Sequence, residues 1–236
     1  MVPSEYEKGL VSVIIPVYNG ASFLARALAS AFEQDYRPLE VIVVDDGSTD
    51  ATARIAQGRP EVRYFYQPNQ GHGTAKNTGI EKSRGEFLAF LDADDWWASG
   101  KLRLQVDFLE SHPQVGYVLS HMKIILEPGA EIPSGFKPEL LQQPSPAFLP
   151  SALAVRREIM SKVGVFDPSF RIGNDTDWFF RAQDMGIPRA VLPDVLLYKS
   201  FHGKNDTYQV QMLTKDMFRS IRASIQRKSR SEKSGT

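Results

Sequence analysis

The order of apolar runs and helical patterns constrains the fold more than any other feature of this sequence. Four short runs rich in β-branched and aromatic residues predict buried strands. Helical spacing of apolar residues, as at Phe23, Leu24, Ala27 and Leu28, fills the intervals between them. Strands that alternate with helices across short connections predict a mostly parallel, three-layer α/β/α sheet fold. The predicted strands are residues 11–17, 39–44, 62–66 and 87–91.

The second half of the chain continues with less regular connections. Pro193 lies inside the last predicted strand, which we therefore expect at a sheet edge, because proline has no N–H to donate to a ladder. No boundary between domains is visible, so the later strands are expected to join the same sheet. The pattern predicts helices at residues 101–111, 157–163 and 175–186 and from about residue 208, and strands at 116–126, 151–155 and 190–198.

We divide the chain into one domain with two irregular segments. Residues 1–10 form an N-terminal extension, and residues 11–126 form the first half of the domain. Residues 127–150, with six prolines, predict a long flexible loop. Residues 151–228 form the second half, and residues 229–236 are expected to be a disordered basic tail.

Composition excludes several classes of protein. The 28 basic and 28 acidic residues balance, which gives no sign of a nucleic-acid partner. The chain has no cysteine, hence no disulfides and no thiolate metal site, as suits a reducing compartment. It has no signal-peptide pattern and no run of 18 apolar residues. We therefore expect a soluble, cytoplasmic protein, and contact with the inner face of a membrane stays open.

Three carboxylates follow the fourth apolar run within four positions, at Asp92, Asp94 and Asp95. Carboxylates at this spacing repel one another, and a divalent cation with a preference for oxygen ligands, Mg²⁺ or Mn²⁺, would hold them ionised. The same stretch is equally typical of a solvated acidic turn that caps the helix beginning near residue 99. On these residues alone the two interpretations are balanced.

Polar groups also follow two other predicted strands, at Tyr18–Asn19 and at Asp45–Asp46. Ligands of open α/β sheets bind beyond the carboxyl ends of the strands, so these groups are expected to converge. The first strand is followed by neither a G-x-G-x-x-G sequence nor a Walker A loop, which argues against a dinucleotide dehydrogenase and a P-loop ATPase.

Four motifs resemble, in order and spacing, those of family 2 glycosyltransferases. The resemblance is strong over residues 11–101 and continues weakly to about residue 206. It implies the GT-A fold, a Rossmann-like variant of the predicted sheet, and use of a nucleotide-diphosphate sugar by residues 11–126, with the acceptor held by residues 151–228. The motifs are VIIPVYN at 13–19, VVDDGSTD at 43–50, KNTG at 76–79 and FLDADD at 90–95.

The resemblance implies a donor pocket from these motifs. Tyr18 would lie beside the nucleotide base, and Asp46 would accept a hydrogen bond from it. Asp92 would reach the ribose or the metal through the D-x-D element, which includes Ala93. Lys76 resembles a basic residue near the donor, with a solvated helix charge as the alternative. The donor-side set is Pro16, Tyr18, Asn19, Asp46, Lys76, Asp92 and Ala93.

Asp94 matches the metal ligand of this family, and His202 matches a further ligand on a loop over the donor. The cation, Mn²⁺ or Mg²⁺, would bridge the two phosphates of the donor. Asp95 either caps the following helix or contacts the sugar, and Trp96 either packs beneath the site or lines it.

Inverting members of the family use a carboxylate to deprotonate the attacking hydroxyl. Asp175 matches that base, with Asp177 as the fallback, and the alternative is an N-cap of the following helix. Asn174 replaces the usual Glu, which puts a supporting contact in doubt. Arg156 resembles a basic residue that pairs with phosphate or acceptor, with a solvated charge as the alternative.

The sequence thus predicts a metal-dependent inverting glycosyltransferase that acts in polysaccharide or glycoconjugate synthesis on a glycan or lipid-linked acceptor. UDP-sugars are favoured as donors by resemblance. A sugar nucleotidyltransferase and a nucleotide-sugar binding protein, or inactive relative, stay as alternatives. The basic C-terminal residues suggest either a solubilising end or peripheral attraction to an anionic membrane, and a homodimer is left open.

Overall fold

The computed structural model describes residues 2–132, 139–170, 172–203, 205 and 210–234. Within these residues nine strands form one mixed sheet in the order β3-β2-β1-β4-β8-β6-β9-β5, with β7 paired to β6. The sheet holds both halves of the chain, so the later strands join it as the sequence predicts.

The first half is the parallel part of the sheet. It contains the strands β1 (Glu7–Val17), β2 (Leu39–Asp45), β3 (Val62–Tyr66) and β4 (Gly85–Phe90), all parallel. The helices α1 (Leu24–Phe32), α2 (Thr52–Gln57) and α3 (His72–Lys82) connect them. The β1 strand takes in residues 7–10, which the sequence assigns to an extension.

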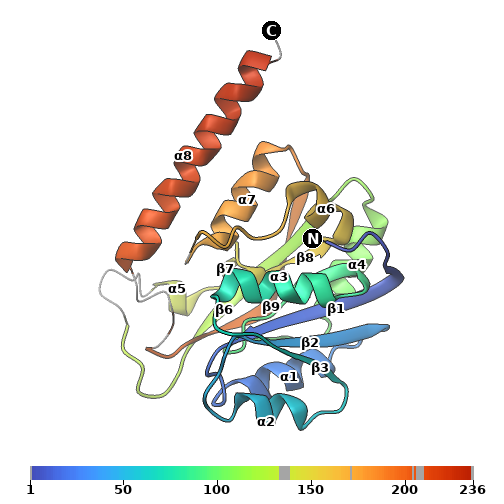
Figure 1. Cartoon of the computed structure of the whole chain (residues 1–236), viewed down its shortest axis with the longest axis vertical. Coiled ribbons are helices and arrows are strands. Elements are labelled where there is room, and N and C mark those ends of the chain that lie inside the picture. The colour runs from blue at the N-terminus through green and yellow to red at the C-terminus, as the bar shows by residue number, and fades with distance from the viewer. Residues whose placement is uncertain (1, 133–138, 171, 204, 206–209, 235–236) are drawn as a thin grey trace.

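Helices cover both faces of these strands because their side chains alternate between two apolar cores. Val41 and Val43 of β2 pack in the core that contains Leu24 and Leu28 of α1. Ile42 and Val44 face the other way and pack with Ala75 of α3. Figure 1 shows α1 and α2 on one side of β1–β3 and α3 on the other. The predicted α/β/α layering is confirmed here.

The second half is not parallel throughout. It contains β5 (Trp96–Trp97), α4 (Lys101–Ser111), β6 (Tyr117–Leu126), β8 (Ala154–Arg156), α6 (Arg157–Val163), α7 (Asn174–Asp184) and β9 (Arg189–Phe201). The short β8 is antiparallel to both β4 and β6, and β6 is parallel to β9. The sheet is therefore mixed, and its parallel character belongs to the first half.

Pro193 lies in a part of β9 that forms an edge of the sheet, as the sequence predicts. On the side of β9 away from β6, the described strands pair only with Leu197 and Tyr198, through the two-residue β5. The register between β6 and β9 shifts between Leu192 and Val195, so Pro193 lies in an irregularity of the ladder. A bulge tolerates the missing N–H as well as an edge does.

The segments predicted to be irregular are partly regular. Residues 127–150 contain α5 (Glu139–Gln142), β7 (Ser145–Pro146) and the start of the 3₁₀ helix η1 (Pro150–Ala152), and residues 133–138 lie outside the described part. The last helix, α8 (Val210–Ser234), includes most of the predicted disordered tail, because the tail lacks proline and glycine up to Ser234. Residues 235 and 236 lie outside the described part.

Candidate active site

A cleft of about 770 Å³ lies beyond the carboxyl ends of β1 and β4, where an open α/β sheet binds its ligands. Its second wall comes from the start of α7 and from the residues that follow β9. The cleft brings together ten residues that the sequence predicts for the site. These are Pro16, Tyr18, Asn19, Lys76, Asp92, Ala93, Asp94, Asn174, Asp175 and His202.

The loop after β1 is held to the loop after β2. Asn19 adopts a left-handed backbone, with φ of 50°, and its Oδ1 accepts a hydrogen bond from the backbone N–H of Thr49 at 2.8 Å. In return its own N–H donates to Ser48 Oγ at 2.8 Å. Tyr18 is left 50% exposed on this fixed loop. Its ring therefore offers a stacking surface at one end of the cleft.

The sequence leads us to expect Asp46 beside the nucleotide base, but Asp46 is not among the residues that line the cleft. Its carboxylate is buried and accepts hydrogen bonds from Gln67 Nε2 at 2.7 Å and from the backbone N–H groups of Gln70 and Gly71 at 2.9 and 2.8 Å. Asp46 thus fixes the loop that leads into α3. Asp45 braces its own turn, because its Oδ1 accepts a hydrogen bond from the N–H of Ser48 at 2.8 Å.

Asp94 and His202 meet at the floor of the cleft. Asp94 Oδ2 lies 2.9 Å from His202 Nε2 and accepts a hydrogen bond from Asn205 Nδ2 at 3.0 Å. Burial alone would raise the pKa of Asp94, but the hydrogen bond from His202 and the charge of Lys199 outweigh it and lower that pKa. The bond with Asp94 in turn raises the pKa of His202. The imidazole stacks on Phe23, with ring centroids 4.3 Å apart.

Asp95 points away from the cleft into the protein. Its side chain is fully buried and contacts Lys199 Nζ at 3.4 Å and the backbone N–H of Ser200 at 3.0 Å. Burial raises the pKa of Asp95 despite Lys199, and the charges of Asp94 and Asp92 add to the rise. Asp95 therefore neither caps the following helix nor contacts a sugar. It anchors residues 92–95, which we call the acidic loop, to β9.

The residues at the floor of the cleft suit a divalent cation that is coordinated partly by the protein and partly by atoms of a bound substrate. Among the described residues no group of three or more His, Asp or Glu side chains is arranged to hold a metal. Asp94 and His202 nevertheless converge, and Asp92 Oδ1 and His202 Nδ1 are buried without a hydrogen-bond partner in the described part. One or two protein ligands, completed by phosphate oxygens and water, is a common set for Mg²⁺ and Mn²⁺.

The backbone of the acidic loop is braced from below. Ser151 Oγ accepts a hydrogen bond from the N–H of Asp92 at 3.0 Å, and Trp97 Nε1 donates to the carbonyl of Ser151 at 2.7 Å. Trp97 is buried, and the ammonium of Lys101 lies 4.2 Å from its ring centroid. Trp97, and not Trp96, is therefore the tryptophan that packs beneath the site.

Asp175 and Asn174 form the opposite wall, at the first turn of α7. Asp175 is half-buried and lines the cleft, and its Oδ1 accepts a hydrogen bond from the N–H of Thr176 at 2.9 Å. Asn174 Oδ1 accepts a hydrogen bond from Lys76 Nζ at 3.2 Å. Lys76 is only 4% exposed, so it is not a solvated helix charge.

Besides Asp46 and Asp95, three more predicted residues lie away from the cleft. Trp96 pairs with Tyr198 across β5 and β9 and stacks on its ring, with centroids 5.5 Å apart. Asp177 is buried in an ion pair with Arg181 at 2.8 Å on the same helix, so it is not placed as a fallback base. Arg156 pairs with Phe87 near the amino end of β4, the end opposite the cleft, and donates to backbone carbonyls. It is neither a solvated charge nor an acceptor contact.

Sequence reasoning missed Lys199 and Asn205, which both line the cleft and contact the acidic loop. Each lies three positions from His202, on opposite sides of it. Both residues could have been found from the sequence, because they belong to a group of polar residues directly after an apolar predicted strand. The same pattern identified Asp92, Asp94 and Asp95.

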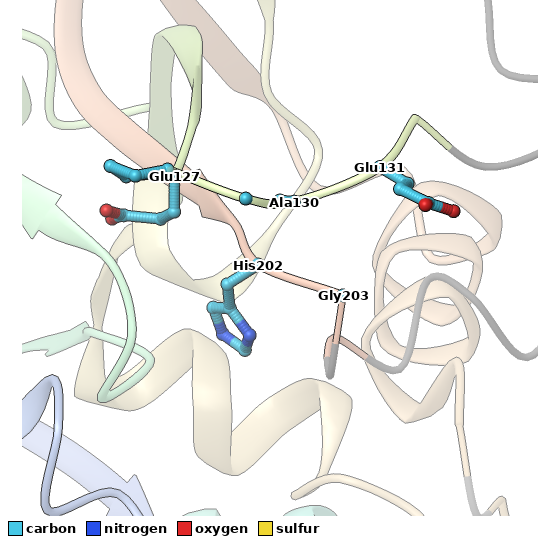
Figure 2. Close-up of a pocket in the computed structure, with 7 residues that line it drawn as sticks. Glu127, Ala130, Glu131, His202 and Gly203 are labelled. Atoms are coloured by element: carbon cyan, nitrogen blue, oxygen red, sulfur yellow. The ribbon is translucent and has the colours of Figure 1, made fainter.

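A smaller cavity of about 350 Å³ adjoins the cleft at His202. It lies between residues 127–131 and Gly203, and Figure 2 shows the imidazole beneath the 127–131 segment. Glu127 turns its carboxylate toward Arg26, at 2.6 Å, and Ser200 Oγ, at 2.8 Å. The segment after β6 is thereby tied to the loop that carries His202.

Comparison with known proteins shows the family to which this chain belongs. The sequence model of "Glycosyl transferase family 2" matches residues 12–174. An uncharacterized glycosyltransferase of Nostoc sp. is 32% identical over 234 residues, which cover 92% of this chain and 72% of the relative. Chondroitin synthase of Escherichia coli is 28% identical, with 92% of this chain and 33% of the relative covered.

Solved structures agree in fold. S. aureus TarS in complex with UDP-GlcNAc superposes with a TM-score of 0.72 at 22% identity, over 92% of this chain and 66% of that one. A mannosyltransferase from Pyrobaculum calidifontis, in complex with GDP-Man and Mn²⁺, gives a TM-score of 0.69 at 26% identity, over 90% and 64%.

The chain therefore belongs to glycosyl transferase family 2 and has the GT-A-type α/β fold, which confirms the predicted family, fold and enzyme class. It spans only part of several relatives, such as 58% of an uncharacterized glycosyltransferase of Rickettsia typhi.

Proposed function

We propose that this chain is a metal-dependent, inverting glycosyltransferase that moves a sugar from a nucleotide diphosphate to an acceptor hydroxyl. The observation that carries the proposal is that one cleft holds a candidate metal site on its floor and a candidate base on its wall. Asp94 and His202 lie on the floor beyond β4, and Asp175 lies at the start of α7. Such a cleft can hold a leaving diphosphate at one side and a base at the other.

The donor would lie along the strand ends. Tyr18 stacks on the nucleotide base, and the 16–19 loop sets the depth of that end of the cleft. Lys76 supplies a buried positive charge to the phosphates or the sugar. Asp46 acts indirectly in this scheme, by holding the loop before α3 in place.

Asp94 and His202 would hold Mn²⁺ or Mg²⁺, and Asp92 lies close enough in sequence to contact it or the ribose. The chemistry that such a cation would supply is positive charge, which would stabilise the departing diphosphate. Lys199 contributes a fixed positive charge beneath the same loop. Asn205 orients the Asp94 carboxylate through its hydrogen bond.

Asp175 would take the proton of the acceptor hydroxyl. The acceptor oxygen forms a bond to the anomeric carbon as the bond from that carbon to the diphosphate oxygen breaks, so the configuration inverts in one displacement. The acceptor would be a glycan or a lipid-linked sugar. UDP-sugars remain the favoured donors, although the two solved relatives named above carry UDP-GlcNAc and GDP-Man.

The test compares two variants on one donor panel. Asp175→Asn should bind UDP with Mn²⁺ like the parent by calorimetry but lose about 10²–10⁴-fold in turnover of the donor, the usual contribution of a positioned base. Asp94→Ala should lose both turnover and the Mn²⁺ dependence of UDP binding. Asp194→Asn, at an exposed position of β9, is the matched control.

Parent-like turnover by both variants would refute the assignment. Binding of a nucleotide sugar without turnover of any donor by the parent would instead support a binding protein.

A further inference from the structure

The α8 helix presents several of its described apolar side chains to the outside. Phe218 is 63% exposed, Ile225 is 60% exposed and Ile221 is half-buried. Positions 218, 221 and 225 lie on one face of a helix, because they are separated by three and four residues. These three residues define what we call the outer stripe. A helix at the surface of a globular protein normally turns its apolar stripe toward the core.

The inner face of α8 is polar instead. Ser224 Oγ donates to Asp184 Oδ1 at 2.7 Å at the end of α7, and Arg227 Nε donates to Asp184 Oδ2 at 2.8 Å. Asp216 is buried and accepts a hydrogen bond from the N–H of Ile172 at 3.1 Å. Specific polar contacts thus fix the rotation of α8, so the outward direction of the stripe is not an accident of a loosely attached helix.

Basic residues flank the outer stripe. Lys215 and Arg222 are exposed, and no ion pair is found for either within the described part. The helix contains seven Lys and Arg against two acidic residues, and one of the two, Asp216, faces inward. A second copy of this surface would meet like charge, whereas a bilayer with anionic lipids offers apolar depth and the opposite charge.

We propose that the outer stripe and its flanking cations bind the surface of an anionic lipid membrane, with α8 lying in the interfacial plane. Figure 1 shows α8 extending past the rest of the molecule, where it is free to meet a flat surface. No helix in the described part of the chain is long and apolar enough to span a bilayer, so the contact is peripheral.

The same helix reaches the rim of the cleft. Its Asp216 binds the backbone at Ile172, and a Cβ at Gly173 would lie 3.5 Å from the Asp216 Cβ. Both Ile172 and Gly173 line the cleft. Arg219 lies over the Phe170 ring at 4.1 Å from its centroid and fixes the preceding turn. Membrane contact through α8 would therefore hold the cleft at a set position relative to the lipid surface.

Cosedimentation of the chain with vesicles tests the proposal without any donor or acceptor. Vesicles of phosphatidylcholine mixed with phosphatidylglycerol should pellet the parent at least tenfold more strongly than phosphatidylcholine alone, and added salt should weaken binding. Phe218→Ser combined with Ile225→Ser should abolish pelleting, and Lys215→Gln combined with Arg222→Gln should reduce it several-fold.

Leu104→Ser and Arg54→Gln, exposed residues of α4 and α2, are matched controls and should bind like the parent. Circular dichroism checks that each variant is folded. Equal binding to both vesicle types, or equal loss in the controls, would overturn the proposal. So would a dimer, seen by sedimentation equilibrium without lipid, that the Phe218→Ser and Ile225→Ser changes dissociate, because a second copy would then cover the stripe.

Discussion

Lys76 is a buried cation whose partner in this chain carries no charge. Its Nζ donates to the amide oxygen of Asn174, and no carboxylate in the described residues lies within ion-pair distance of it. An ammonium removed from water is destabilised unless an anion or several hydrogen-bond acceptors replace the water. The structure thus leaves a positive charge at the cleft that a phosphate group of the donor can neutralise.

Asn174→Glu should place a carboxylate against Lys76 and compete with that phosphate. We expect UDP to bind about tenfold to a hundredfold more weakly, the loss of one charge-assisted hydrogen bond, and uridine to bind as in the parent. Calorimetry with UDP and uridine measures both, and Asn174→Gln, which keeps an uncharged amide, is the control. Parent-like UDP affinity in the Glu variant would mean that Lys76 does not meet the phosphates.

At the scale of elements, α3 is positioned by its contact with β1. A Cβ at Gly79 would lie only 2.3 Å from Ile14 Cγ2, so the helix crosses the strand where no side chain fits. Asn77 fixes the opposite side of the same helix to Phe166. Its Nδ2 donates a hydrogen bond to the carbonyl of Phe166 at 2.7 Å, and its Oδ1 accepts one from the N–H of Phe166 at 3.0 Å. These contacts set the position of Lys76 on α3 relative to the sheet.

Gly79→Ala should push α3 away from β1. We expect a loss of about 1–3 kcal/mol in the free energy of unfolding, as is typical of overpacked cores, measured by urea denaturation. Glu81→Ala, which changes an exposed residue of the same helix, should lower the free energy of unfolding by much less. A Gly79→Ala protein as stable as the parent would show that α3 can move without penalty.

Local patterns in the sequence were sufficient to predict the strands and helices of the first half, and most of the predicted site residues line the cleft. The antiparallel insertion of β8 between β4 and β6 was not predicted, because three residues of a strand carry no pairing signal. Arg156 was misplaced for the same reason, since its position depends on that pairing.

At the scale of the whole molecule, Glu40 joins the amino-terminal part of the sheet. Its carboxylate accepts hydrogen bonds from Ser12 Oγ at 2.6 Å, from the N–H of Arg84 at 2.7 Å and from the Arg63 guanidinium. These partners belong to β1, to the turn before β4 and to β3. Burial alone would raise the pKa of Glu40, but these hydrogen bonds lower it below its ordinary value of 4.5.

Because the folded pKa is lowered, Glu40 contributes its full stabilisation above about pH 4.5 and loses it as the pH falls through the folded value. Glu40→Gln should therefore cost about 1–3 kcal/mol near neutral pH, and the gap to the parent should close in acid. Urea unfolding across this pH range measures the gap, with exposed Glu61→Gln as control. A gap that is independent of pH would contradict the role of the ionised carboxylate.

The ion pair between Asp95 and Lys199 spans 104 positions of the chain, and the bond from Asn205 to Asp94 spans 111. A ribosome makes the acidic loop long before it makes the residues that neutralise and orient it. During synthesis the first four parallel strands can pair while these carboxylates still face water. The floor of the cleft is therefore completed last. A nascent chain that stalls before β9 would contain most of the sheet but neither Lys199 nor Asn205, which neutralise and orient the carboxylates.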